Sequence, residues 1–191
     1  TCIISTVVTD YASRTIVLKE KSQRKMPEDD GKADDEKILI PVKYPETCDT
    51  LLNMAMLMRN EKLSRGLIAL NVVYDDLDAT YNQQEGQRLL EQIEKKAAAA
   101  DVQVQTQVRL ATNIANGIKH AFKEYDASEI ILGQHIHDNS TRRFWGQFAQ
   151  SLFNGLNRQI IIARCTIPLN TIRVFHVAVP SRAEYEPGFY R

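Results

Sequence analysis

The sequence lacks the features that define several large classes of protein. Its three cysteines, Cys2, Cys48 and Cys165, lie far apart in 191 residues and form neither a CxxC pair nor a cysteine–histidine metal pattern. A disulfide framework is therefore not indicated, and we expect a reducing compartment. No apolar run is long enough to cross a bilayer by itself, and the first residues show no cleavable signal pattern.

An excess of charge of one sign is also absent, because 24 basic side chains balance 24 acidic ones. Bulk binding of nucleic acid usually needs a basic excess or patch, so we expect no nucleic-acid partner. With 43% hydrophobic and 25% charged residues, the composition is that of an ordinary soluble domain. The length suits one α/β core with some sequence left over.

Common catalytic motifs are missing as well. There is no G-x-S-x-G elbow, no H-E-x-x-H pair and no G-x-x-x-x-G-K-S/T phosphate loop. His135 and His137 form a His-x-His pair, but no further ligand with suitable spacing accompanies them, so we predict no metal site. Cys48 follows the expected start of a helix, where a dipole can lower a thiol pKa, although we prefer a buried and inert thiol. We expect no catalytic residues and no enzyme activity.

From residue 37 to residue 168, apolar runs alternate with amphipathic stretches. This order predicts an α/β fold with a five-stranded, mainly parallel sheet and helices on both faces. Glutamine and valine alternate in 102–108, which indicates that one face of that strand meets solvent. The expected strands are 37–42, 66–73, 102–108, 129–133 and 159–163. The expected helices are about 47–60, about 83–99, one beginning near Thr112 or Asn113 as the cap, and 141–156.

Ligands of an open parallel sheet bind at the carboxyl ends of its strands. Two loops qualify here, 41–46 after the first strand and 133–146 after the fourth. The second loop is preceded by the run Asp126-Ala127-Ser128-Glu129-Ile130-Ile131-Leu132-Gly133. The first loop opens with Pro41-Val42-Lys43.

With this run and this order of elements, residues 37–168 resemble the universal stress protein family. The resemblance implies an adenine nucleotide alpha hydrolase-like fold, and a nucleotide site made by the two loops. Members that bind ATP carry Gly-x-x-Gly, nine further residues and then Gly-Ser or Gly-Thr. The glycines let backbone amides reach the phosphates, and the hydroxyl adds a donor.

The chain departs from this pattern in both loops. Gly133 and Gly146 match the first and third glycines, but Ile136 replaces the second and Gln147 replaces the hydroxyl residue. A β-branched side chain obstructs a backbone that must fold closely around phosphate. In the first loop, ATP-binding members carry a Pro-x-Asp pattern, and in this chain Lys43 replaces the aspartate.

We therefore predict a degenerate nucleotide or anion site without a bound cofactor, and we disfavour ATP or another adenine nucleotide. Four basic residues would attract an anion, unless they are solvated loop residues, which is the interpretation that we prefer. They are Lys43, His135, Arg142 and Arg143. The candidate residues are Pro41, Val42, Lys43, Gly133, His135, Gly146 and Gln147.

The two flanking segments indicate a context for the domain. Residues 1–36 pass from an apolar stretch through basic residues to an acidic stretch, as at the end of a membrane helix followed by a juxtamembrane linker on the cytoplasmic side. A disordered or swapped arm is the alternative. The run from Thr6 to Arg14 resembles the end of the last membrane helix of bacterial cation:proton antiporters. In residues 169–191, the run 174–180 resembles 37–41 and predicts a second repeat or an extra C-terminal strand.

The leading hypothesis is the cytoplasmic regulatory region of a sodium or potassium:proton antiporter. The domain would lie at the cytoplasmic face of the inner membrane, joined to the membrane transporter part of the same polypeptide. It would act by dimerisation or effector binding, with the homodimer formed through the last strand, Gln159–Ala163, as the resemblance implies. The alternative is a free-standing, nucleotide-binding universal stress protein with an N-terminal extension.

Overall fold

The computed structural model describes residues 36–60, 64–134, 140–156, 158–164 and 166–183. The predicted juxtamembrane segment therefore lies outside the described residues, apart from Glu36. The candidate residue His135 and its neighbour Ile136 also lie outside them. Among the described residues, no helix is both long enough and apolar enough to span a membrane.

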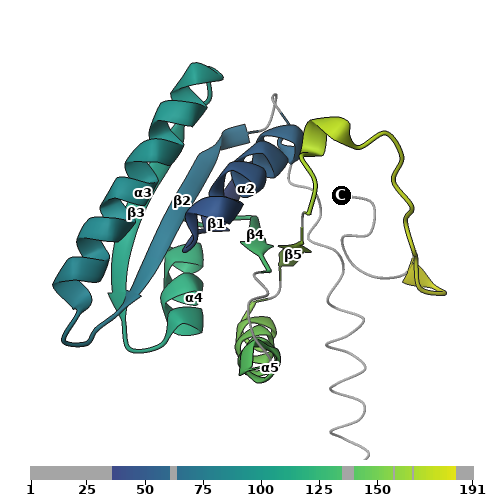
Figure 1. The fold of residues 1–191 in the computed structure, drawn as a ribbon. Helices are drawn as coiled ribbons and strands as arrows, with labels where there is room; N and C mark the ends of the chain where they lie inside the picture. The colour runs from purple at the N-terminus through teal and green to yellow at the C-terminus, as the bar shows by residue number, and fades with distance from the viewer. Residues whose placement is uncertain (1–35, 61–63, 135–139, 157, 165, 184–191) are drawn as a thin grey trace, which may run out of the picture. The chain divides into compact units, whose positions relative to one another are not determined.

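Five parallel strands form one sheet in the order β3-β2-β1-β4-β5 (Figure 1). On one side of β1, β2 pairs with β1 and β3 pairs with β2. The chain then crosses to the other side of β1, where β4 pairs with β1 and β5 pairs with β4. The carboxyl ends of β1 and β4 thus flank the point where the strand order reverses, which is where ligands bind in such sheets. The strands are β1 (Glu36–Pro41), β2 (Ser64–Tyr74), β3 (Val104–Ala111), β4 (Glu129–Gly133) and β5 (Gln159–Ala163).

The helices cover both faces of the sheet, as the sequence predicts. Alternation along β1 shows the division: Ile38 and Ile40 are buried with α2 and α3, whereas Leu39 is buried with α4 and α5. Burying each such side chain stabilises the fold by about 1.5–3 kcal/mol, so an apolar run is required wherever both faces are covered. The helices are α2 (Pro45–Met58), α3 (Ala79–Ala99), α4 (Ile114–Glu124) and α5 (Ser140–Phe153).

Local chemistry explains where elements begin and end. Of the two cap candidates, Thr112 and Asn113, it is Asn113 that caps α4, and its side chain accepts a hydrogen bond from the Asn116 backbone N–H at 3.1 Å. Asp101 has φ 55°, and the Val102 N–H donates to the Ala97 carbonyl at 2.9 Å, which closes the end of α3. This turn delays β3, which begins at Val104 and not at the expected residue 102.

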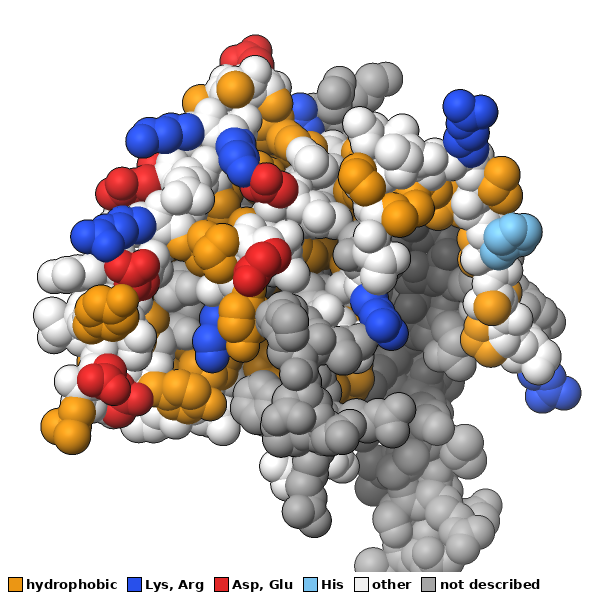
Figure 2. All heavy atoms as spheres, in the orientation of Figure 1, with side chains coloured by type: hydrophobic (Ala, Val, Ile, Leu, Met, Phe, Trp, Pro, Cys, Tyr) orange, Lys and Arg blue, Asp and Glu red, His pale blue; other side chains and the backbone are white. Residues whose placement is uncertain are grey.

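The carboxyl-terminal run lies outside the sheet. Val174, Phe175 and Val177 are exposed, and no described residue between 174 and 180 belongs to a strand. Hydrophobic side chains along this run are visible at the right of Figure 2. The expected extra C-terminal strand is therefore not formed on this sheet, because the run makes no ladder with a described strand. The start of a second repeat stays a prediction.

Candidate functional site

The loop after β1 is fixed to β2 by both backbone groups of Val42. The Val42 N–H donates to the Leu70 carbonyl at 2.8 Å, and the Asn71 side-chain Nδ2 donates to the Val42 carbonyl at 2.8 Å. Asn71 is only 5% exposed, and it is the buried polar residue among the described core residues. The sequence analysis missed it, although an amide inside the apolar run 67–73 was the available signal. Because Val42 is already bonded within the fold, the loop is held in place without a ligand.

Lys43 and the start of α2 already make contacts within the fold. The Lys43 Nζ lies 5.5 Å from the centre of the Tyr44 ring, a cation–π contact of about 0.5–1 kcal/mol at an exposed position. Pro45 has no N–H to offer, and the Thr47 N–H donates to the Tyr44 carbonyl at 3.2 Å. Glu46 places a carboxylate in the first turn, where it already complements the helix dipole.

Gly133 ends β4 beside α2, so the structure brings it to the same edge as Pro41, Val42 and Lys43. A Cβ atom added at Gly133 would lie 3.0 Å from Leu51 Cδ1 and 3.5 Å from Thr47 Cβ. The glycine therefore permits close packing of α2 against β4. This packing alone accounts for the residue, whatever the loop binds.

Gly146 and Gln147 lie inside α5, which begins at Ser140. In an α-helix, only the first four N–H groups lack a partner, and every later one donates to the carbonyl four residues earlier. The N–H groups of Gly146 and Gln147 fall in the second turn and are committed to the helix.

Replacing Gly146 by alanine should stabilise the domain by about 0.5–1 kcal/mol, because glycine in a helix interior loses more backbone entropy than alanine. A Cβ atom at this position meets no atom within 4 Å. Urea unfolding of the two proteins measures the difference. A destabilisation would show that the fold needs glycine here.

Cys48 is a buried thiol and not a nucleophile. It is 4% exposed, its Sγ donates to the Tyr44 carbonyl at 3.1 Å, and burial, followed by the nearby Asp49, raises the thiol pKa to about 12. At pH 8 only about one thiol in ten thousand would be ionised. Iodoacetamide should therefore leave Cys48 unmodified in the folded protein and label it in urea, as read by mass spectrometry. Labelling in the folded state at a similar rate would contradict this assignment.

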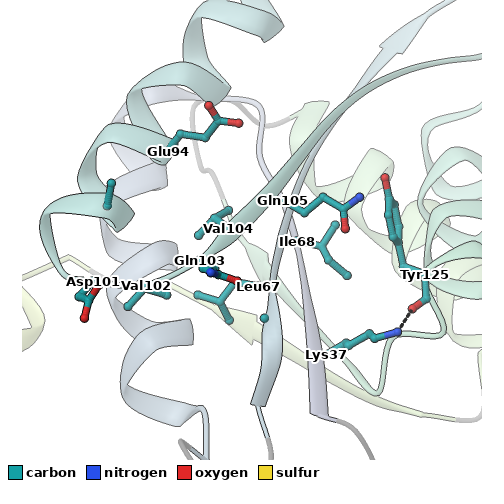
Figure 3. A pocket seen from close by; sticks show the side chains of 12 residues that line it. Lys37, Leu67, Ile68, Glu94, Asp101, Val102, Gln103, Val104, Gln105 and Tyr125 are labelled. Carbon is teal, nitrogen blue, oxygen red and sulfur yellow. Dashed lines mark hydrogen bonds between the residues drawn. The ribbon is translucent and has the colours of Figure 1, made fainter.

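A hollow of about 680 Å³ lies at the opposite edge of the sheet, near the amino ends of β2 and β3. Leu67, Ile68 and Val104 line it, with Glu94 of α3 on one side (Figure 3). On the other side, the Lys37 Nζ donates to the Tyr125 carbonyl at 3.1 Å. This hollow is remote from the predicted loops. Among the described residues, no group of three or more His, Cys, Asp or Glu side chains could hold a metal ion.

Solved structures with the same fold are found at low sequence identity. A universal stress family protein from Burkholderia pseudomallei is 18% identical with a TM-score of 0.54, and the match covers 70% of this chain and 98% of that one. The protein MJ0577 is 17% identical with a TM-score of 0.57, covering 70% and 99%. A universal stress protein solved in complex with cAMP is 9% identical with a TM-score of 0.52, covering 69% and 98%. These matches show the fold alone.

The search among curated proteins gave no match. The sequence pattern of the universal stress protein family matches residues 36–164, which span all five strands and the four described helices. The order of elements, the parallel sheet and this match agree, and the chain belongs to the universal stress protein family.

Proposed function

We propose that this universal stress protein domain is a regulatory module, which acts by pairing with a second copy or by binding a small effector. In this proposal it catalyses no reaction and does not bind ATP in the manner of the family's ATP-binding members. The observation that carries the proposal is the position of Gly146 and Gln147 inside α5, where their backbone N–H groups are unavailable. The first loop supports it, because Val42 is bonded to Leu70 and Asn71.

The context that we propose is the cytoplasmic side of a bacterial sodium or potassium:proton antiporter. The apolar, basic and acidic order of residues 1–36, and the resemblance of Thr6 to Arg14 to the end of a transporter helix, support this context. Pairing of two domains would then bias the conformational equilibrium of the transporter.

Pairing through β5 is part of the proposal. The strand lies at one edge of the sheet, Ile162 is 41% exposed, and an unpaired edge offers backbone groups to a second copy. Replacing Ile162 by lysine would weaken that pairing, which sedimentation velocity measures.

The test of the context begins with the gene. Several hydrophobic spans encoded upstream of residue 1 are expected, and their absence would favour a free-standing stress protein. Exchange of cations for protons in membrane vesicles would then be compared between the complete protein and a version without residues 37–183. We expect exchange to persist with an altered dependence on pH or cation concentration. An unaltered dependence would contradict the regulatory role.

A further inference from the structure

β3 forms the other edge of the sheet, and its backbone shows which groups face outward. The carbonyls of Gln103 and Ala111 accept from the Leu67 and Asp75 N–H groups of the β2 side, at 3.4 Å and 3.2 Å. In a parallel ladder, alternate residues face the same neighbour. The odd-numbered residues of β3 therefore bond to β2. The N–H and C=O groups of Val104, Thr106, Val108 and Leu110 point away from the sheet.

Most of this edge lacks the usual protection against pairing. Residues 102–108 contain no charged side chain and no proline, and β3 is eight residues long. Edge strands that do not pair are usually short, charged or interrupted by proline or a bulge. Asp101 and Arg109 flank this run, and Arg109 forms an ion pair with Glu124 of α4.

Side chains on β3 complement one another across such an edge. Val104 and Val108 pack on the face covered by α2 and α3, so Leu110 lies on that face too and is 41% exposed. The hollow of about 680 Å³ adjoins the other end of the same strand, where Leu67 and Val102 line it (Figure 3). An exposed leucine and a hollow whose lining includes Leu67, Val102 and Val104 thus lie at opposite ends of one strand.

We propose that β3 is a self-pairing edge, which binds the β3 strand of a second copy in antiparallel orientation. The register follows from placing Leu110 of each copy opposite Val102 of the other, at the hollow. Thr106 then lies on the two-fold axis, and Val104 faces Val108 of the second copy. The outward backbone groups of these residues form the hydrogen-bonded pairs.

The same register pairs glutamines on the opposite face. Gln107 lies opposite Gln105 of the second copy, and the side-chain amides of two facing glutamines can hydrogen-bond to each other. This surface is separate from β5, at the other edge of the sheet, so it does not depend on the proposed regulatory function.

Cysteine cross-linking tests the register. Gln105 and Gln107 of two copies would form a non-hydrogen-bonded pair with Cα atoms about 4.5 Å apart, within the range that a disulfide spans. The full chain is used with Cys2→Ser and Cys165→Ser, and the buried Cys48 is kept. A mixture of the Gln105→Cys and Gln107→Cys proteins should form disulfide-linked dimers under mild oxidation. Each protein alone should not, because its cysteines are two residues out of register.

Two substitutions of matched exposure show which edge is used. Leu110 and Ile162 are both 41% exposed, the first on β3 and the second on β5. Leu110→Asp would place a carboxylate at the hollow beside Glu94 and Asp101, and should lower the cross-linking yield of the mixture at least tenfold, whereas Ile162→Asp should leave it unchanged. Circular dichroism confirms that each variant is folded.

Thr106→Lys should also disrupt the pairing of the two β3 strands, and it should leave the single domain folded. Thr106 donates to the Glu94 carboxylate of α3, so a lysine there retains a partner within its own copy. It also puts two like charges on the two-fold axis, and the yield should fall. Equal cross-linking by either cysteine protein alone, a yield unaffected by Leu110→Asp, or no cross-linking in the folded mixture would each overturn the proposal.

Discussion

Replacing Gly86 by alanine should destabilise the domain when Asn71 is present and stabilise it when Asn71 is alanine. A Cβ atom at Gly86 would lie 2.4 Å from Asn71 Oδ1 and 2.9 Å from Asn71 Cγ. The amide cannot easily move aside, because it is buried and bonded to the Val42 carbonyl. Overpacking of this kind typically costs about 1–3 kcal/mol.

The effect of Gly86→Ala on stability should change sign in the Asn71→Ala protein, because the amide atoms that clash with the new Cβ atom are absent. Alanine in the interior of α3 then stabilises by up to about 1 kcal/mol relative to glycine. Urea unfolding of the four proteins in this double-mutant cycle measures the coupling between the two positions. Additive effects would contradict the contact between α3 and the amide that holds the first loop.

Replacing Gly133 by valine should destabilise the domain by about 1–3 kcal/mol, because two methyl groups would be forced between β4 and α2. The first added carbon already comes within 3.0 Å of Leu51 Cδ1, and Leu51 is 2% exposed. Thermal and urea unfolding measure the loss.

Gly146→Val is the matched control, since a Cβ atom there meets nothing within 4 Å. We expect Gly146→Val to unfold at a urea concentration close to that of the parent protein. Gly133→Val should unfold at a lower urea concentration. Equal effects of the two valines would mean that Gly133 is not needed for the packing of α2.

The periodicity of the sequence predicts most of the fold because both faces of the sheet are covered. Ile38, Leu39 and Ile40 must all be apolar when successive side chains enter two different core layers, and such runs are visible without a structure. The amphipathic stretches predict the helices for the same reason, and Asn113 marks the start of α4 by its side-chain chemistry.

The candidate site is less predictable because it depends on pairings between distant residues. The bond between Asn71 and Val42 joins β2 to the loop after β1, and the glycine that accommodates Asn71 belongs to α3. The spacing from Gly133 puts Gly146 at the third glycine of the family pattern, but this spacing cannot show that α5 begins six residues earlier. The sequence also leaves open which strands are edges, a property decided by the order of the sheet.

We propose that this domain does not bind a triphosphate in the manner of the family's ATP-binding members, because Gly146 and Gln147 lie inside α5 and Val42 is bonded within the fold. Isothermal titration of the full chain with Mg-ATP tests it most directly. We predict no saturable heat at protein concentrations of tens of micromolar. Saturable binding that disappears in Gly146→Val, while folding is retained, would contradict the account.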